Sequence, residues 1–206
     1  MTRRPGRPAG GKRVVDRTEI LDSAERVIRR DGANATIEAI AVEAGVTKPT
    51  IYAWAGDRTT LADALGERLV ELLADRNREA ITRSGGGRPG LVAFIETTLD
   101  TMAEQRDLFL FVTNAPADDT ARQRLRLTMR ASEPLADEYA RQRTAQGLDP
   151  AVSVAWANAV TGMLNTISLW WISESDESAS TIAEQLADLL WPGLSGTSDA
   201  AMDSLR

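Results

Sequence analysis

The stretch that decides the fold is residues 36–61, which read TIEAIAVEAGVTKPTIYAWAGDRTTL. A short helix capped by Thr36 is predicted to end at Gly45, because glycine readily adopts the left-handed conformation of a tight turn. A second short helix is predicted to open at Thr47, and a third begins at Asp57. This layout is typical of a helix-turn-helix, whose second helix fits the DNA major groove.

A further helix is predicted immediately before this motif. Asp16 and Glu19 form a start that resembles a capping box, and Gly32 provides a stop. The apolar positions between them share one face of the helix, namely Ile20, Leu21, Ala24, Val27 and Ile28. Together these elements predict a small helical domain over residues 17–60.

The rest of the chain is also predicted to be helical, with no strand pattern and no repeat. Gly66 can permit close helix packing, Gly85–Gly87 reads as a linker, and Pro134 should kink or split its helix. The fold class is therefore all-α: an N-terminal three-helix helix-turn-helix domain and a larger helical domain at 61–194, about nine helices in all, with a flexible tail at 195–206. The helices are predicted at 57–83, 88–105, 107–114, 119–146, 150–172 and 178–191.

Composition narrows the range of functions. The chain contains no cysteine and no histidine, which excludes disulfides, thiol redox chemistry, zinc-finger sites and histidine acid–base catalysis. No phosphate loop, dinucleotide fingerprint or metal-ligand spacing appears, so we expect no enzyme activity, cofactor or metal. No secretory signal and no apolar run of about 20 residues is present, so a cytoplasmic protein without membrane contact is expected.

The charge is distributed unevenly along the chain. Residues 1–17 hold six basic side chains and one acidic one, a net charge of +5, whereas the whole chain carries −6. Residues 1–16 are predicted to form a basic flexible arm that contacts DNA locally. Arg3 and Arg4 precede a Gly-Arg-Pro sequence whose arginine is Arg7, and arginines on an extended chain fit a narrow minor groove. Such a tail can alternatively serve solubility alone.

Residues 20–61 resemble the DNA-binding domain of the TetR family of transcriptional regulators. Outside this span the resemblance lies in length, helical character, a Gly162…Trp170-Trp171 region and a Leu-Ala-Asp-Leu-Leu ending at 186–190. The matching residues in the DNA-binding part are Ile20, Leu21, Ala24, Gly32, Thr36, Ile40, Ala41, Ala44, Gly45, Val46, Thr47, Thr50, Ile51, Tyr52, Ala53, Trp54, Arg58 and Leu61.

Two positions depart from the family pattern. Ala55 stands where the family usually has a phenylalanine, so Trp54 or Ile28 is expected to fill the space. Arg58 replaces the usual lysine, which keeps the charge and adds a forked donor.

The resemblance implies which side chains contact DNA. Thr47, Lys48 and Ala53 would face base edges, where a lysine can donate to guanine and a methyl can contact thymine. Phosphate contacts, which set register without reading sequence, would come from Thr36, Thr50, Tyr52, Trp54 and Arg58. Tyr52 and Trp54 can alternatively pack the small domain.

The resemblance also implies a homodimer through the helices at 150–172 and 178–191, bound to a palindromic operator in double-stranded DNA. A monomeric bundle with the first of these helices at its centre is the alternative. A small, largely apolar effector would displace the helix at 57–83 and release a repressor from DNA. Pocket candidates are Phe94, Thr98, Leu99, Met102, Phe109, Phe111, Met129, Trp156, Asn158, Met163, Asn165 and Trp170.

One alternative function stays open from the sequence. The same DNA-binding dimer could work without a small-molecule effector, under the control of a protein partner or of its own abundance.

Overall fold

The structure is a computed structural model that describes residues 16–55, 57–114 and 120–194. These ranges contain nine α-helices and two short 3₁₀ turns and no strand. The all-α prediction is therefore confirmed. The helices are α1 (Arg17–Asp31), α2 (Ile37–Glu43), α3 (Lys48–Ala55), α4 (Arg58–Ser84), α5 (Gly87–Glu104), α6 (Arg106–Thr113), α7 (Thr120–Ala145), α8 (Ser153–Glu174) and α9 (Ala179–Leu194), and the turns are η1 (Gly32–Asn34) and η2 (Pro150–Val152).

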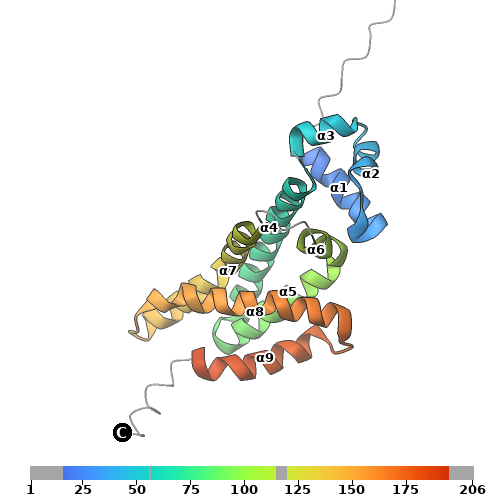
Figure 1. Cartoon of the computed structure of the whole chain (residues 1–206). Helices are drawn as coiled ribbons and strands as arrows, with labels where there is room; N and C mark the ends of the chain where they lie inside the picture. The colour runs from blue at the N-terminus through green and yellow to red at the C-terminus, as the bar shows by residue number, and fades with distance from the viewer. Residues whose placement is uncertain (1–15, 56, 115–119, 195–206) are drawn as a thin grey trace, which may run out of the picture.

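Helices α1, α2 and α3 gather at one end of the molecule, which we call the head (Figure 1). The starts of α1 and α2 are each fixed by a local side chain. The Asp16 carboxylate accepts from the Glu19 amide at 2.8 Å, and the Thr36 hydroxyl accepts from the Ala39 amide at 3.2 Å. These bonds satisfy amides that would otherwise lack a partner, so both predicted caps are confirmed.

The long helix α4 leads from the head into the rest of the molecule, which we call the body (Figure 1). The glycine run after α4 is a built turn rather than an open linker. Gly85, Gly86 and Gly87 all have positive φ, and α5 begins at Gly87. The Gly87 amide donates to the Glu138 carboxylate at 3.3 Å, and a Cβ at Gly86 would collide with that carboxylate. The turn is thereby fastened to α7.

Two helices of the body contain a proline and continue through it. Helix α7 continues through Pro134 without being split, and α9 runs past Pro192 to Leu194. A proline removes one backbone donor and crowds the preceding turn, but tertiary packing on a long helix can offset that cost.

The buried apolar residues form two clusters. The first cluster joins α1, α2 and α3 of the head to α4, α6 and Met102 of α5, and the second joins α5, α7, α8 and α9 with the end of α4. The head therefore shares its core with three helices of the body. Large members of the first cluster include Ile20, Ile28, Ile40, Ile51, Leu65 and Phe111; those of the second include Phe94, Ile95, Leu99, Leu135 and Leu164.

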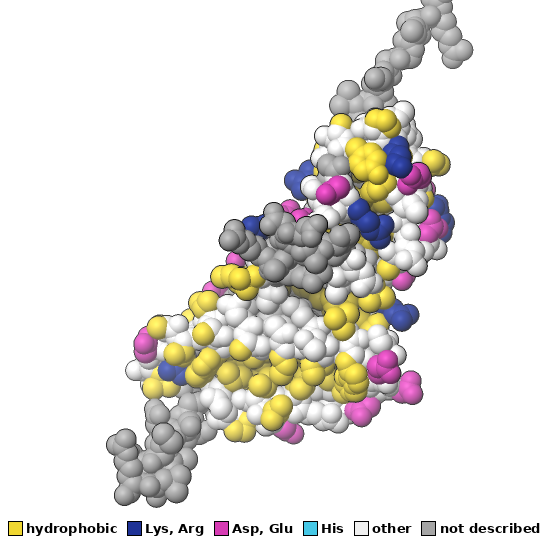
Figure 2. Space-filling model, in the orientation of Figure 1, with side chains coloured by type: hydrophobic (Ala, Val, Ile, Leu, Met, Phe, Trp, Pro, Cys, Tyr) yellow, Lys and Arg dark blue, Asp and Glu magenta, His cyan; other side chains and the backbone are white. Residues whose placement is uncertain are grey.

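An apolar band runs along α8 and α9 on one face of the body (Figure 2). Val154 and Trp170 of α8 are 56% and 48% exposed, and Leu189 of α9 is 70% exposed. Ala155 and Ala159 are exposed on α8 as well. Within the described ranges, the chain holds no helix with both the length and the apolar character needed to span a membrane.

Candidate nucleic-acid interface and core cavity

Helix α3 presents a polar edge to solvent. Thr47, Lys48, Thr50 and Ala53 are all exposed, whereas Ile51 on the opposite side is fully buried in the first cluster. The Thr47 and Thr50 hydroxyls lie 2.9 Å apart and hydrogen-bond to each other. The predicted base-reading residues thus lie on an outward face, and the buried Ile51 and partly buried Trp54 hold the helix against the first cluster, which is the geometry that groove insertion needs.

Lys48 is engaged by an acidic neighbour that the sequence analysis did not single out. Its ammonium donates to the carboxylate of Glu38 in the first turn of α2 and lies 5.6 Å from the centroid of the Tyr52 ring. The hydrogen bond raises the pKa of Lys48 and lowers the pKa of Glu38. An acid in a first helical turn is explained by the helix dipole, so only the fold reveals this pairing. A base contact by Lys48 requires the pair to open.

The predicted phosphate-contacting residues other than Arg58 divide into three exposed side chains and one that is partly buried. Thr36, Thr50 and Tyr52 are exposed, with Tyr52 at 42%. Trp54 packs partly buried against the first cluster, and the Arg17 guanidinium lies 5.7 Å from its ring centroid. The packing alternative therefore describes Trp54 better than Tyr52.

The expectation that Trp54 or Ile28 fills the space beside Ala55 stays a prediction. Ile28 is 1% exposed in the first cluster that Trp54 contacts. The surroundings of the Ala55 side chain lie outside the described residues, and so do the arm arginines Arg3, Arg4 and Arg7.

Arg58 does not project outward as predicted. Its two terminal nitrogens donate to the carbonyl oxygens of Ala35 at 2.5 Å and Ala33 at 2.8 Å. Its guanidinium carbon lies 4.2 Å from the centroid of the Phe111 ring in α6. An arginine fork can satisfy two carbonyls while stacking on an aromatic face. These contacts direct the side chain inward, so a phosphate contact by Arg58 would require the fork to leave the two carbonyls.

The helix that follows starts at a well-formed cap. The Asp57 carboxylate accepts from the Thr60 amide at 2.8 Å and also from the Thr60 hydroxyl. Both hydrogen bonds lower the pKa of Asp57, and the bond from the Thr60 amide has the larger effect. The predicted start of the helix at Asp57 is confirmed.

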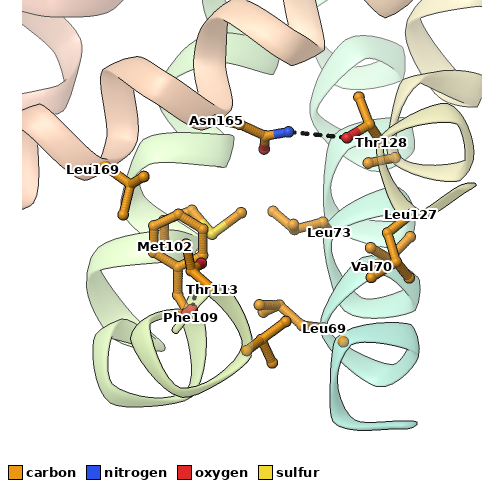
Figure 3. A pocket seen from close by; sticks show the side chains of 13 residues that line it. Leu69, Val70, Leu73, Met102, Phe109, Thr113, Leu127, Thr128, Asn165 and Leu169 are labelled. Atoms are coloured by element: carbon orange, nitrogen blue, oxygen red, sulfur yellow. Dashed lines mark hydrogen bonds between the residues drawn. The ribbon is translucent and has the colours of Figure 1, made fainter. Parts of the chain in front are cut away.

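A cavity of about 170 Å³ lies in the body beside α4. Its wall is almost entirely apolar, and its polar corner is the Asn165 amide, which donates to the Thr128 hydroxyl at 3.1 Å (Figure 3). No charged side chain is found among its described lining residues. These come from α4, α5, α6, α7 and α8: Gly66, Leu69, Val70, Leu73, Met102, Phe109, Val112, Thr113, Leu127, Thr128, Ala131, Asn165 and Leu169.

Three of the predicted pocket residues line this cavity: Met102, Phe109 and Asn165. The other predicted pocket residues do not line the cavity. An inward-facing helical stripe predicts burial, but it does not predict where the packed helices leave a cavity. Met129 and Trp170 are largely exposed. Phe94, Thr98, Leu99 and Phe111 are buried without lining the cavity, and Trp156, Asn158 and Met163 are partly buried away from it.

None of the cavity residues on α4 was among the predicted pocket residues. The one useful signal in the sequence was Gly66, expected to permit close packing. A Cβ there would lie 3.0 Å from a Leu127 methyl and 3.2 Å from a Val112 methyl. The absence of a side chain lets α4 approach α6 and α7 at the cavity edge.

Two family models together match most of the chain. Residues 20–65 match the model described as bacterial regulatory proteins, tetR family, and residues 76–205 match the tetracyclin repressor-like C-terminal domain. The chain belongs to the TetR family. Its members are transcriptional regulators, so this TetR-family protein is a helix-turn-helix DNA-binding regulator and not an enzyme.

Relatives of this TetR-family chain support the same assignment. It is 25% identical over 192 residues to an uncharacterized HTH-type transcriptional regulator of Mycobacterium tuberculosis, covering 91% of this chain and 81% of the relative. Solved structures share the fold. AlkX of Dietzia, a TetR family repressor implicated in biodegradation of n-alkanes, has a TM-score of 0.62 at 22% identity, covering 87% of this chain and 98% of AlkX. FadR of Bacillus subtilis in complex with stearoyl-CoA has a TM-score of 0.65 at 16% identity, covering 86% and 99%.

Proposed function

We propose that this regulator is a dimeric repressor that binds a palindromic operator and is released by a small, largely apolar effector. The observation that carries the proposal is the continuity of the first cluster. It extends from Ile51 under the DNA-reading helix to Leu69, Leu73 and Phe109 on the wall of the cavity. A molecule that fills the cavity therefore touches the same packed core that supports the reading helix.

Thr47, Lys48 and Ala53 are the proposed base-reading residues, supported by their exposure on one edge of α3. Thr36, Thr50 and Tyr52 are the proposed phosphate contacts, with Arg3, Arg4 and Arg7 of the arm in the minor groove. Lys48 can donate to guanine O6 or N7 once it leaves Glu38. A well-formed contact of this kind discriminates against the wrong base by about 1–3 kcal/mol.

The apolar band along α8 and α9 supports the proposed dimer. Large exposed side chains such as Trp170 and Leu189 favour burial against a second copy. Ala155 and Ala159 are small enough for two α8 helices to approach closely. Two heads carried by one dimer can span half-sites about 34–36 Å apart, which gives a palindrome its specificity.

The cavity supports a neutral effector of modest size. An apolar cavity of about 150 Å³ accepts a ligand as large as benzene, and this cavity is of similar volume. Its described wall offers one amide–hydroxyl corner and no cation for a phosphate. We therefore favour a small apolar molecule with at most one polar group over a ligand of the stearoyl-CoA type found in the Bacillus structure.

The test is operator binding by the full chain, with DNA from directly upstream of its own gene as the target and toluene, indole and 1-hexanol as probes. We expect binding to one inverted repeat, an increase in Tm with at least one probe and release of the DNA by that probe. Ala131→Phe, which fills the cavity wall, should abolish the Tm increase. Tight operator binding with no response to any probe would favour the alternative in which a protein partner or abundance provides control.

The dimer has its own test. Ala159→Arg places a charge in the proposed α8 contact. Sedimentation should then show single subunits, whereas the unmodified chain is expected to sediment as a dimer. A monomeric wild-type chain would refute this part of the proposal.

A further inference from the structure

Arg58 lies at a place where the head, α4 and α6 meet. It is the first residue of α4, its guanidinium holds the carbonyls of Ala33 and Ala35, and it lies against the ring of Phe111. Ala35 is 1% exposed and Phe111 is fully buried. These contacts tie the start of α4, the connection into α2, and α6 into one unit.

The carbonyl contacts attach Arg58 to the backbone that directly precedes α2. Ala33 lies in η1, and Ala35 directly precedes Thr36, the N-cap of α2. Helix α2 packs against α3 through the first cluster. A shift of the guanidinium would therefore change the position of Thr36, a proposed phosphate contact, and of the reading helix α3.

The ring contact connects the same side chain to the cavity. Phe111 is flanked on α6 by residues that line the cavity, Phe109 on one side and Val112 and Thr113 on the other. Helix α6 has only eight residues, so a displacement at Val112 also moves the neighbouring ring. Packed cores respond to such displacements by discrete rearrangement rather than by gradual compression.

We propose that Arg58 is a positioning residue that transmits the state of the cavity to the DNA-reading head, through the Phe111 ring on one side and the Ala33 and Ala35 carbonyls on the other. The inference rests on the proposed ligand-controlled function and names its internal link. It replaces the phosphate contact expected for this position, because in this structure the guanidinium donors are used inside the protein.

Gly66→Ala serves as a ligand-free probe of this link. The added methyl would press on Val112 at 3.2 Å and Leu127 at 3.0 Å. Gly90→Ala is its matched control, since the methyl there meets Ser84 and Ile81 at ordinary distances of 3.6 and 3.7 Å. Arg58→Lys keeps the charge but loses the planar fork, and Phe111→Leu keeps Arg58 and removes only the ring.

The experiment is a double-mutant cycle in the full chain. Gly66→Ala should weaken operator binding at least fivefold with Arg58 present, as is typical of coupling between sites. In Arg58→Lys or Phe111→Leu backgrounds, the same change should weaken binding less than twofold. An equal loss in all backgrounds, no loss with Gly66→Ala, or a matching loss with Gly90→Ala would overturn the proposal. Both backgrounds are used so that one poorly folded variant does not decide the outcome.

Hydrogen exchange gives a readout that needs no DNA. Gly66→Ala should accelerate exchange of the amides at 35–39 at least fivefold in the Arg58 chain and add nothing further in the Arg58→Lys chain. Acceleration of equal size in both chains would refute the link. If the unmodified chain fails to bind its upstream DNA while this exchange pattern holds, the proposed function fails and the link itself survives.

Discussion

The two apolar clusters differ in what they connect. The second cluster joins α5, α7, α8 and α9 with the end of α4 and carries the exposed band proposed for dimer contact, whereas the first joins three head helices to α4, α6 and Met102 of α5. The cavity lies against the first cluster through Leu69, Leu73, Met102 and Phe109. The difference teaches that the head and the effector site share a core, while the platform that would hold two subunits together is packed separately.

Ion pairs follow the same division. Arg68 of α4 bonds Asp22 at 2.8 Å and Glu25 at 3.1 Å, so α4 is also tied to α1 of the head. Arg88 of α5 bonds Glu184 and Asp188 of α9. Exposed pairs contribute little stability, about 0–1 kcal/mol each, so the clusters rather than these pairs hold each unit together.

The largest expected effect comes from emptying either cluster. Phe94→Ala in the second cluster and Phe111→Ala in the first should each lower the free energy of unfolding by about 3–5 kcal/mol, because both rings are buried. Urea denaturation followed by circular dichroism measures this. A loss below about 1 kcal/mol for Phe94→Ala would mean that the second cluster collapses around the gap and is not a rigid support for the dimer contact.

Lys48→Ala tests the outer edge of the head. We expect operator affinity to fall by about 1–3 kcal/mol, with a much smaller loss on DNA of random sequence, measured by fluorescence anisotropy at fixed salt. Glu38→Ala is the matched control: it removes the partner carboxylate and a negative charge near the phosphates, so affinity for all DNA should rise. An equal loss on operator and random DNA for Lys48→Ala would deny it a base-reading role.

The cap at the junction of head and body should have an intermediate effect. Asp57→Ala removes the acceptor for the Thr60 amide and should cost about 1 kcal/mol of unfolding free energy at pH 7. Because the hydrogen bonds lower the pKa of Asp57 from its ordinary value of 3.8, its charged form is favoured by folding. This contribution is fully present above pH 3.8 and is lost as the pH falls through the lower, folded-state value.

Asp57→Asn separates capping from titration. Asparagine keeps an acceptor and has no acidic proton, so most of the stability should remain at pH 7 while the acid-dependent part disappears. Thermal unfolding of the three chains between pH 3 and pH 7 measures both. A wild-type chain whose Tm shares the pH profile of Asp57→Asn would show that the cap charge contributes nothing.

The smallest expected effect compares two helical glycines. Gly90→Ala should stabilise the chain by about 0.4–1 kcal/mol, since a methyl fits there and the unfolded chain loses freedom. Gly66→Ala should show no such gain because its methyl crowds Val112 and Leu127. The measurement is the midpoint of urea denaturation. Equal gains in stability at both positions would mean that the residues around Gly66 accommodate an added methyl as easily as those around Gly90.

Local signals predicted the fold well, and long-range ones did not predict the site. Asp16, Thr36 and Asp57 were identified as caps because capping depends on residues within one turn. The direction of Arg58 depends on Phe111, which is 53 positions away in the chain, and no local pattern reports such a contact. The cavity was found in part: Met102, Phe109 and Asn165 were named, but Gly66, Leu69 and Leu73 became wall residues only through helix packing.

The ion pair between Lys48 and Glu38 has a consequence for how the protein would search a genome. A lysine already satisfied by a carboxylate gains little from an arbitrary stretch of duplex, since breaking the pair leaves an acid facing the backbone phosphates. Only a correctly placed guanine compensates for that exchange. We therefore expect a short residence time on unrelated DNA and fast dissociation from it. Glu38 would in this way shorten the time that the protein needs to find its operator.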